Sequence, residues 1–268
     1  MTDCVGEPLM VEQKSRTDKK YYNIASLEKG IRMLELLAAH GELSVSEAAR
    51  LMDTNRAGSH RFISTLKDLG YVEKNSSNKY QPTLKIMTLS QKVADRFEIR
   101  RMAKPHMHRL SMLYKETINL GLFKNQEIIH IDKIDSLEVL RMDSALGDKA
   151  PAYCTGLGKS ILAFLPDHEL EHYVNTVDRR PLAPNTITDK DEFLQELSRV
   201  RRNGYAIDDE EMTIGLRCIA APIFDHNHYP AYAVSISGPA MRLTHRALEE
   251  MKSHILKVSE DLSHKMGS

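Results

Sequence analysis

Apolar residues near the start of the chain recur every three or four positions, which is the spacing of one helix face. The first run predicts a helix that ends at Gly41, where a left-handed cap fits. Its apolar positions are Ile24, Leu27, Ile31, Leu34 and Leu37. The capping box Ser44-Val-Ser-Glu47 predicts a second, short helix from Ser46 to Met52. A third helix is expected from about Arg56 to Leu69, with a buried face made of Phe62, Ile63, Leu66 and Leu69.

Two short strands are expected next, at residues 71–74 and 79–82, joined by the polar tip Asn75-Ser-Ser-Asn78. Helices with a tight turn before the third one, followed by a hairpin, have the order of a winged helix-turn-helix. The polar side of the third helix holds no acidic residue until Asp68, which suits an element that enters a DNA groove. A solvated face of a small helical domain is the alternative. The candidates for DNA contact are Ser46, Asn55, Arg56, Ser59, His60, Arg61, Ser64 and Lys79.

The pattern then changes to a mixture of helices and short apolar strands. Residues 83–101 predict a connecting helix that continues into 102–116, with an interruption near Pro105. Strands are expected at 117–123, 127–134, 138–143, 217–224 and 230–237. Helices are expected from Gly156 to Leu165, from Pro166 onward, from Thr188 or Asp189 to Gly204, and from Thr244 to His264. Hairpins combined with helical connections predict an α+β sheet domain.

Composition and charge support two globular domains with different partners. The 268 residues suffice for two cores, and 41% apolar with 28% charged residues excludes wholesale disorder. Residues 1–102 carry 17 Lys and Arg against 13 Asp and Glu, a net +4, whereas residues 103–268 carry 20 against 24, a net −4. The basic first part favours a polyanionic partner. Residues 1–22 lack periodicity and are expected to form a flexible arm.

The compartment expected from the sequence is the cytoplasm. No apolar run approaches the roughly 20 residues that cross a bilayer, so no membrane partner is expected. The polar start of the chain does not resemble a secretory signal. The three cysteines, at positions 4, 154 and 218, fit neither a disulfide framework nor the paired spacing of a zinc site.

Several motifs, in this order and spacing, resemble those of the IclR-type bacterial transcription regulators over nearly the whole chain. They are Ser26-Leu-Glu-Lys-Gly, Ser46-Glu-Ala-Ala-Arg50, His60-Arg-Phe-Ile-Ser-Thr-Leu66, Leu69-Gly-Tyr-Val72, Tyr153-Cys-Thr-Gly-Leu-Gly-Lys159, Gly204-Tyr-Ala-Ile-Asp-Asp-Glu-Glu211, Gly215-Leu-Arg-Cys-Ile-Ala-Ala-Pro222 and Ser235-Ile-Ser-Gly-Pro239. The resemblance implies a sequence-specific DNA-binding regulator that is a homodimer or homotetramer on a near-palindromic operator. It implies a winged helix-turn-helix domain at 23–83, a linker helix at 84–101 and a GAF-like effector-binding domain at 102–268.

The candidate effector pocket centres on the strand at 230–237. Its alternate residues Ala231, Ala233, Ser235 and Ser237 share one small, hydroxyl-bearing face, which leaves room for a ligand or, alternatively, for close helix packing. The effector implied by the resemblance is a small organic acid. Backbone N–H groups of Gly156 and Leu157 and the two serine hydroxyls would hold its carboxylate, while Asp208 would accept a ligand hydroxyl or be protonated. The resemblance implies contacts at Val139, Met142, Gly156, Leu157, Asp208, Leu216, Cys218, Ser235 and Ser237.

Other chemistries find little support. Gly156-Leu-Gly-Lys-Ser160 is not a phosphate-binding loop, because that motif needs a glycine where this chain has Tyr153. Nothing places a base beside Cys154 or Cys218, and the pairs His106-Met-His108 and His226-Asn-His228 are too sparse for a metal site. No catalytic residue, metal or cofactor is therefore expected. The remaining alternative is a metabolite-binding protein or enzyme that acts through the C-terminal domain alone.

Overall fold

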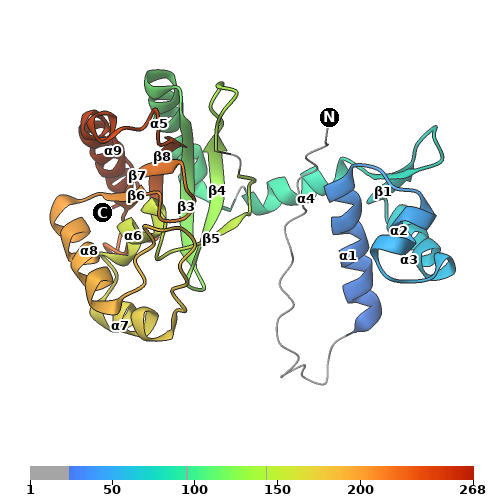
Figure 1. Cartoon of the computed structure of the whole chain (residues 1–268). Coiled ribbons are helices and arrows are strands. Elements are labelled where there is room, and N and C mark those ends of the chain that lie inside the picture. The colour runs from blue at the N-terminus through green and yellow to red at the C-terminus, as the bar shows by residue number, and fades with distance from the viewer. Residues whose placement is uncertain (1–23, 95, 143) are drawn as a thin grey trace, which may run out of the picture. The chain divides into compact units, whose positions relative to one another are not determined.

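The computed structural model describes residues 24–94, 96–142 and 144–268, which form two compact units (Figure 1). The first unit ends at Lys92 and the second begins at Val93, within the expected linker. The expected flexible arm, residues 1–22, lies outside the described residues. Each unit has its own hydrophobic core, so each is described by itself.

The first unit has the element order expected of a winged helix-turn-helix. It consists of α1 (Ala25–His40), α2 (Val45–Leu51), α3 (Arg56–Asp68), β1 (Val72–Lys74), β2 (Tyr80–Pro82) and α4 (Lys85–Ala94). The capping box at Ser44 and Glu47 forms as predicted and starts α2. The two strands pair in an antiparallel hairpin with Val72 opposite Pro82. The core contains Met33, Leu37, Leu43, Ala48, Ile63, Leu66, Val72 and Tyr80.

Ser59 in α3 and Leu69, the residue that follows this helix, lie on the opposite side from the one predicted. Ser59, expected on the polar face, is fully buried, because it lies one helical turn before Ile63 on the same face. Leu69, expected in the core, is 55% exposed, because it is the last residue before Gly70 turns the chain with a φ of +77°. The buried face of α3 therefore consists of Ser59, Ile63 and Leu66.

The second unit is an antiparallel sheet covered by helices on both faces. Its strands are β3 (Thr117–Lys124), β4 (Glu127–Ile134), β5 (Lys149–Pro151), β6 (Ala206–Asp209), β7 (Leu216–Ile223) and β8 (Tyr232–Pro239), in the order β5-β4-β3-β8-β7-β6. The helices are α5 (Glu98–Tyr114), α6 (Gly156–Leu162), α7 (Asp167–Thr176), α8 (Lys190–Asn203) and α9 (His245–Lys265).

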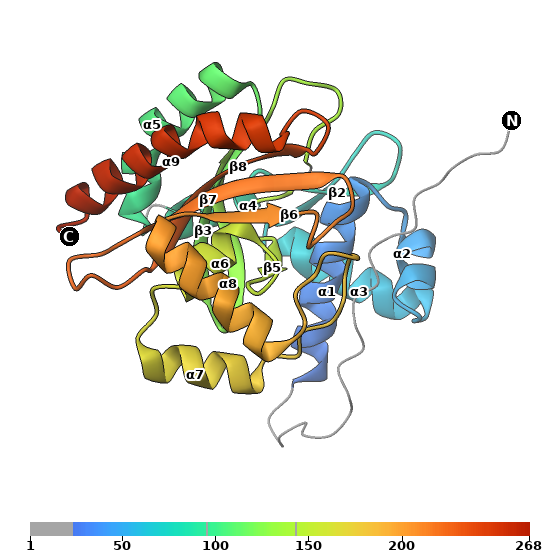
Figure 2. The same cartoon turned by 60° about the vertical axis from the view of Figure 1, so that its left-hand side comes forward.

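Figure 2 shows α5 and α9 side by side on one face of this sheet, with α7 and α8 beyond the other face. The two layers have separate cores. Ile99, Ile118, Ile236 and Ile255 belong to the core under α5 and α9. Ile128, Leu157, Phe193 and Ala220 belong to the core under α6, α7 and α8. The side-chain alternation along each strand separates these two sets of residues.

Three local predictions about the linker and the second unit are wrong. Residues 138–142 are not a strand, and Leu137 and Val139 are almost fully exposed, at 99% and 98%. The third strand of that region is β5, which pairs with β4, and the short strand β6 was also missed. The expected linker helix is present as α4 but ends at Ala94 rather than continuing past Arg101. A new helix begins at Glu98, because non-helical Phe97 packs against the core, and Pro105 lies inside that helix.

Candidate functional site

The candidate DNA-contacting surface lies on α3 and begins at its N-terminus. Asn55 caps the helix, its Oδ1 accepting a hydrogen bond from the Gly58 N–H at 2.7 Å. Arg56, His60 and Arg61 are exposed along the helix. Arg61 lies about 200° around the helix from buried Ile63, so its guanidinium points away from the core. The exposed side of α3 therefore presents two guanidinium groups and an imidazole to the solvent.

The other DNA-contact candidates are placed differently. Ser46 is exposed on α2, and Ser64 is half-buried on α3. The Lys79 ammonium lies 3.1 Å from a Glu42 carboxylate oxygen, and hydrogen bonding to this group raises the pKa of Lys79. Ser59 is removed from the surface by burial, and its Oγ has no hydrogen-bond partner among the described residues. Ser59 is thus the one candidate whose side chain is not accessible to DNA in this structure.

A small polar cavity lies inside the second unit, between the sheet and the start of α6. Its volume is about 20 Å³, which is room for about one water molecule. The predicted effector contacts Met142, Gly156, Leu157, Asp208, Leu216, Cys218, Ser235 and Ser237 all line it. Residues that the sequence analysis missed line it as well, namely Asn119, Ile128, His130, Ala150, Thr155 and Met212. We call this space the polar cavity.

Strand register brings the polar side chains together. Asp208 on β6 lies opposite Cys218 on β7, and Cys218 lies opposite Ser237 on β8. Asn119 on β3 lies opposite Ser235. Because neighbouring strands align side chains that share a face, these residues from four strands form one wall. The wall could not be predicted from single strands, since the order β3-β8-β7-β6 is not the order along the chain.

Asn119 is the centre of a buried hydrogen-bond network in the polar cavity. Its Nδ2 donates to Ser235 Oγ at 3.4 Å and to Ser237 Oγ at 3.2 Å. The two serine hydroxyls lie 3.3 Å apart, so one of them can donate to the other. The carbonyl oxygen Oδ1 of Asn119 is buried and has no partner among the described residues. An unsatisfied buried acceptor costs free energy, so it invites a hydrogen-bond donor from a ligand or water.

His130 is a second buried group with unused hydrogen-bonding capacity. It lies on β4 and lines the polar cavity, and its Nδ1 has no partner among the described residues. Burial lowers the pKa of His130, so the ring is held in the neutral form. A neutral imidazole has one donor and one acceptor nitrogen. Both residues carry a signal that could have identified them, because Asn119 and His130 are polar positions between apolar neighbours in predicted strands.

Two carboxyl groups with raised pKa values are Asp208, which lines the polar cavity, and Glu211, whose backbone N–H is hydrogen-bonded to it. Asp208 Oδ1 accepts the Glu211 N–H at 2.8 Å, and its Oδ2 accepts the Cys218 thiol at 3.6 Å. Burial raises the pKa of Asp208 to about 6 and the pKa of Glu211 to about 7. Burial also raises the pKa of Cys218, so this thiol stays protonated and is a poor nucleophile.

Behind the cavity wall, Lys159 is almost completely buried among carboxylates. Its ammonium donates to Glu211 and, at 3.2 Å, to Glu196. Burial alone would lower the pKa of Lys159, but the charges of Glu211 and Glu196 raise it, so the amine remains charged. Lys159, which belongs to the glycine motif that was considered as a phosphate-binding loop, thus connects α6 to α8 and to the loop after β6.

Val139 does not line the polar cavity, although the resemblance implied an apolar contact there. Met142, three residues further along the chain, does line the polar cavity. Residues 138–142 do not pair with a strand in the described part of the chain, so the side chain of Val139 stands in solvent.

A larger, open groove adjoins the polar cavity. It has a volume of about 560 Å³ and shares Met142, Met212 and Leu216 with the cavity, so these three side chains form the partition between the two spaces. Its other lining residues are Leu140, Arg141, Thr213, Ile214, Gly215, Pro239 and Met241. We call it the methionine groove. Arg141 is the one charged residue among the described residues that line it.

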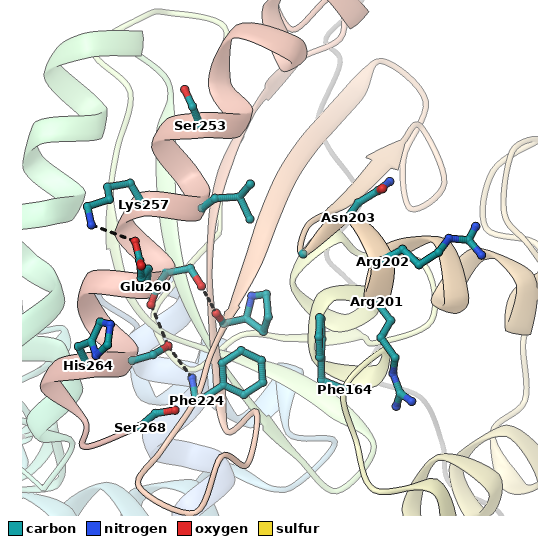
Figure 3. Close-up of a pocket in the computed structure, with 15 residues that line it drawn as sticks. Phe164, Arg201, Arg202, Asn203, Phe224, Ser253, Lys257, Glu260, His264 and Ser268 are labelled. Atoms are coloured by element: carbon teal, nitrogen blue, oxygen red, sulfur yellow. Dashed lines mark hydrogen bonds and ion pairs between the residues drawn. The ribbon is translucent and has the colours of Figure 1, made fainter.

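Another groove, of about 790 Å³, lies between the ends of α8 and α9 and shares no lining residue with the polar cavity (Figure 3). Several of its polar side chains are hydrogen-bonded within the protein. Lys257 donates to Glu260 at 2.9 Å, and Ser263 Oγ accepts the Phe224 N–H at 3.0 Å. Among the described residues, none of its lining side chains is a buried polar group without a partner. This groove therefore lacks the unsatisfied groups that distinguish the polar cavity.

The sequence of this chain matches two family models in the order of its two units. Residues 26–76 match the IclR helix-turn-helix domain, and residues 91–264 match the bacterial transcriptional regulator IclR C-terminal domain. The chain belongs to the IclR family. As an IclR-family member it is a DNA-binding transcriptional regulator, and the α+β fold class predicted from the sequence is confirmed.

Known IclR-family proteins match the chain over most of its length. The HTH-type transcriptional regulator KdgR of Escherichia coli is 34% identical over 251 residues, which cover 93% of this chain and 95% of KdgR. The regulator KipR of Bacillus subtilis is 31% identical over 239 residues, covering 89% of this chain and 96% of KipR. The crystal structure of the Thermotoga maritima IclR has a TM-score of 0.86 at 36% identity and covers 92% of this chain and 100% of that one.

Membership of the IclR family assigns general roles to the two units. The first carries the helix-turn-helix and the second is the effector-binding domain. A protein acting through its C-terminal domain alone is thereby set aside. Among the described residues, no three His, Cys, Asp or Glu side chains gather in a way that could hold a metal ion. No helix in the described part of this IclR-family chain is long and apolar enough to span a membrane.

Proposed function

We propose that this IclR-family regulator binds a near-palindromic operator as a homodimer or homotetramer and that a small organic acid in the polar cavity controls its DNA affinity. Residues 23–83 bind DNA, 84–101 link the domains and 102–268 bind the effector. The protein acts in the cytoplasm and has no catalytic activity of its own. The observation that carries the effector assignment is a buried cavity whose wall holds unsatisfied polar atoms of Asn119 and His130.

The proposed DNA contacts come from the exposed side of α3, from α2 and from the hairpin. In helix-turn-helix proteins, residues near the N-terminus of the recognition helix contact base edges. Asn55 caps this end of α3. Arg56 and Arg61 supply the strongest groups, since a guanidinium binds a guanine edge or a phosphate with paired hydrogen bonds. The other proposed contacts are Ser46, Asn55, His60, Ser64 and Lys79.

Self-association is supported by an apolar surface on the first unit. A groove of about 720 Å³ runs between α1, α3 and α4 and is lined by Leu27, Ile31 and Leu89, among others. These side chains are more than half exposed, as are Ile24, Leu84 and Met87. Contiguous exposed apolar patches on soluble domains usually mark interaction sites. A second copy is the proposed occupant of the α1 and α4 side of this groove, while Arg61, which lines its α3 side, is left to DNA. A near-palindromic operator needs two reading heads related by a two-fold axis.

Binding to DNA from the region upstream of the protein's own gene tests the proposal in two steps. Fluorescence anisotropy of a labelled upstream fragment should show tight, saturable binding that a scrambled fragment does not reproduce. A thermal-shift screen of small carboxylates should then identify a compound that raises the melting temperature and changes operator affinity. Operator binding that no stabilising compound alters would contradict the effector assignment, and absence of specific upstream binding would contradict the choice of operator.

A further inference from the structure

We propose that the effector is an amphipathic hydroxy acid whose hydroxyl lies in the polar cavity, whose apolar body fills the methionine groove and whose carboxylate faces Arg141. This inference rests on the proposed effector site and specifies its ligand. It reverses the orientation expected from the sequence, in which the serine hydroxyls hold the carboxylate. Three observations carry it: the unused groups of the polar cavity, the composition of the methionine groove and the position of the nearby cation.

The polar cavity offers an unused hydrogen-bond acceptor to a ligand and has no cationic side chain in its described lining. Among the described residues, none of its lining side chains is Lys or Arg, so a carboxylate there would be buried without a cation. Asn119 Oδ1 is an acceptor only, and it has no partner. Asp208 is a further acceptor when it is ionised. A ligand hydroxyl can donate to one of these oxygens and accept from a serine hydroxyl, so it satisfies the wall without adding charge.

The methionine groove is suited to an apolar body. Leu140, Met142, Met212, Ile214, Leu216, Pro239 and Met241 make up most of its lining. A sugar acid carries hydroxyls along its whole length, and these would lose their hydrogen bonds to water against such a surface. An aromatic ring or an alkyl chain loses nothing there and gains free energy from burial. Methionine side chains adapt to the shape of such a ligand, because they are flexible and polarizable.

Arg141 is the cation of the methionine groove and fixes the direction of the ligand. Its Nη1 approaches the Glu138 carbonyl oxygen at 3.5 Å, and the other guanidinium nitrogens have no partner in the part of the chain that the structure describes. A carboxylate in the groove can pair with this guanidinium while keeping part of its hydration. A ligand with its hydroxyl in the polar cavity and its acid at Arg141 therefore satisfies both ends.

Entry of such a ligand requires the partition of Met142, Met212 and Leu216 to move. Pockets for small molecules have volumes of roughly 300–1,000 Å³, whereas the polar cavity measures about 20 Å³ and the adjoining methionine groove about 560 Å³. The partition side chains are half-buried, so rotation of their flexible side chains can join the two spaces without a change in the sheet.

A set of four probe compounds tests the ligand class on the full-length protein. The compounds are 4-hydroxyphenylacetate, phenylacetate, 4-hydroxyphenylacetamide and gluconate. We expect 4-hydroxyphenylacetate to bind in calorimetric titration and phenylacetate, which lacks only the hydroxyl, to bind roughly tenfold more weakly. Gluconate should not compete. Tighter binding of gluconate, with release or recruitment of operator DNA, would overturn the inference and leave the proposed function standing.

Two pairs of variants test the position of the ligand. Met241→Gln should weaken binding of 4-hydroxyphenylacetate about fivefold, because it places an amide in the groove, whereas Met112→Gln makes the same change at an exposed methionine on α5. Arg141→Gln should weaken the acid but leave the uncharged amide unchanged. Arg246→Gln, at an exposed arginine paired with Glu250, is its control.

The outcomes separate the inference from the function on which it rests. Loss of acid binding in Ser235→Ala/Ser237→Ala together with full binding in Arg141→Gln would put the carboxylate inside the cavity and overturn the orientation. If no organic acid of either class binds or alters DNA affinity, the effector class in the proposed function fails, and this inference fails with it. Binding of the hydroxylated aromatic acid that depends on Arg141 and Met241 supports both.

Discussion

Gly158 on α6 lies directly against the backbone of Ala152. A Cβ atom built on Gly158 would stand 2.1 Å from the Ala152 carbonyl oxygen, far closer than atoms can approach. This contact lets the first turn of α6 approach the chain that precedes it, where Thr155 Oγ1 accepts the Gly158 N–H at 3.1 Å. The glycine motif beside Lys159 therefore serves close packing at the wall of the polar cavity rather than phosphate binding.

Gly158→Ala should lower the free energy of unfolding of the second unit by about 3 kcal/mol, because backbone must shift to accommodate the methyl group. In most helices, replacement of glycine by alanine stabilises the helix. Gly30→Ala is the matched control, since a Cβ at Gly30 in the middle of α1 would meet no described atom within 4 Å. That variant should raise stability by about 0.5–1 kcal/mol. Thermal unfolding of both variants measures these changes in stability. Equal effects of the two substitutions would contradict the close packing of Gly158 as the cause.

The helices and long strands of this protein could be predicted because local periodicity determines them. The strands that were missed or misplaced depend on partners. Residues 138–142 are as apolar as a strand, yet nothing in the described part of the chain pairs with them, whereas Lys149–Pro151 forms a strand because β4 lies beside it. Ser59 illustrates the same limit, because a serine in a helix is assigned to the exposed face until the packing of the helix is known.

The polar cavity was predicted in part, for a related reason. Ser235, Ser237, Cys218 and Asp208 were found through the alternation of one strand and the family resemblance, and the structure brings them to one wall. Asn119 and His130 reach the same wall from β3 and β4. Their place there follows from the strand order and the register, which hydrogen bonds between distant segments determine and local sequence does not.

Arg56→Ala/Arg61→Ala should weaken operator binding strongly. Loss of a base contact should cost about 1–3 kcal/mol of specificity, and loss of a phosphate contact should weaken all sequences alike and reduce the salt dependence. Anisotropy titrations at several salt concentrations, with operator and scrambled DNA, distinguish the two. Arg246→Ala/Lys257→Ala removes the same charge from exposed positions of the second unit and is the control. Wild-type affinity in the first variant would show that α3 is not the recognition helix.

Leu27→Glu/Leu89→Glu should remove one association step and weaken operator binding about tenfold or more, because two half-sites would no longer be bound by tethered reading heads. Both side chains are more than half exposed on the apolar surface of α1 and α4. Sedimentation should show the particle mass reduced by half. Leu182→Glu, at an exposed leucine of the second unit, should leave mass and affinity unchanged. An unaltered mass in the double variant would place the dimer contact elsewhere.

The stability of the second unit should depend on pH through Asp208 and Glu211. Their ordinary pKa values are 3.8 and 4.5, and burial raises them to about 6 and about 7. Between these limits the folded protein holds protons that the unfolded chain has released, so the free energy of unfolding falls as the pH rises. The buried charges of Lys159 and Glu196 face Glu211, and Lys159 keeps the rise in its pKa from being larger.

The Glu211→Gln variant lacks one of the two carboxyl groups that bind a proton in the folded protein. The decline in the free energy of unfolding between about pH 5 and about pH 7 should become shallower by up to about 1.4 kcal/mol per pH unit. Burial lowers the pKa of His106 and His130, so these groups make stability rise with pH, but both variants retain them. Urea unfolding at a series of pH values measures the slopes, with Glu171→Gln, at an exposed position of α7, as the control. The loss of the ion pair between Lys159 and Glu211 lowers overall stability, which does not affect a comparison of slopes. Identical slopes in wild type and Glu211→Gln would show that the Glu211 carboxyl titrates in the folded protein as it does in the unfolded chain.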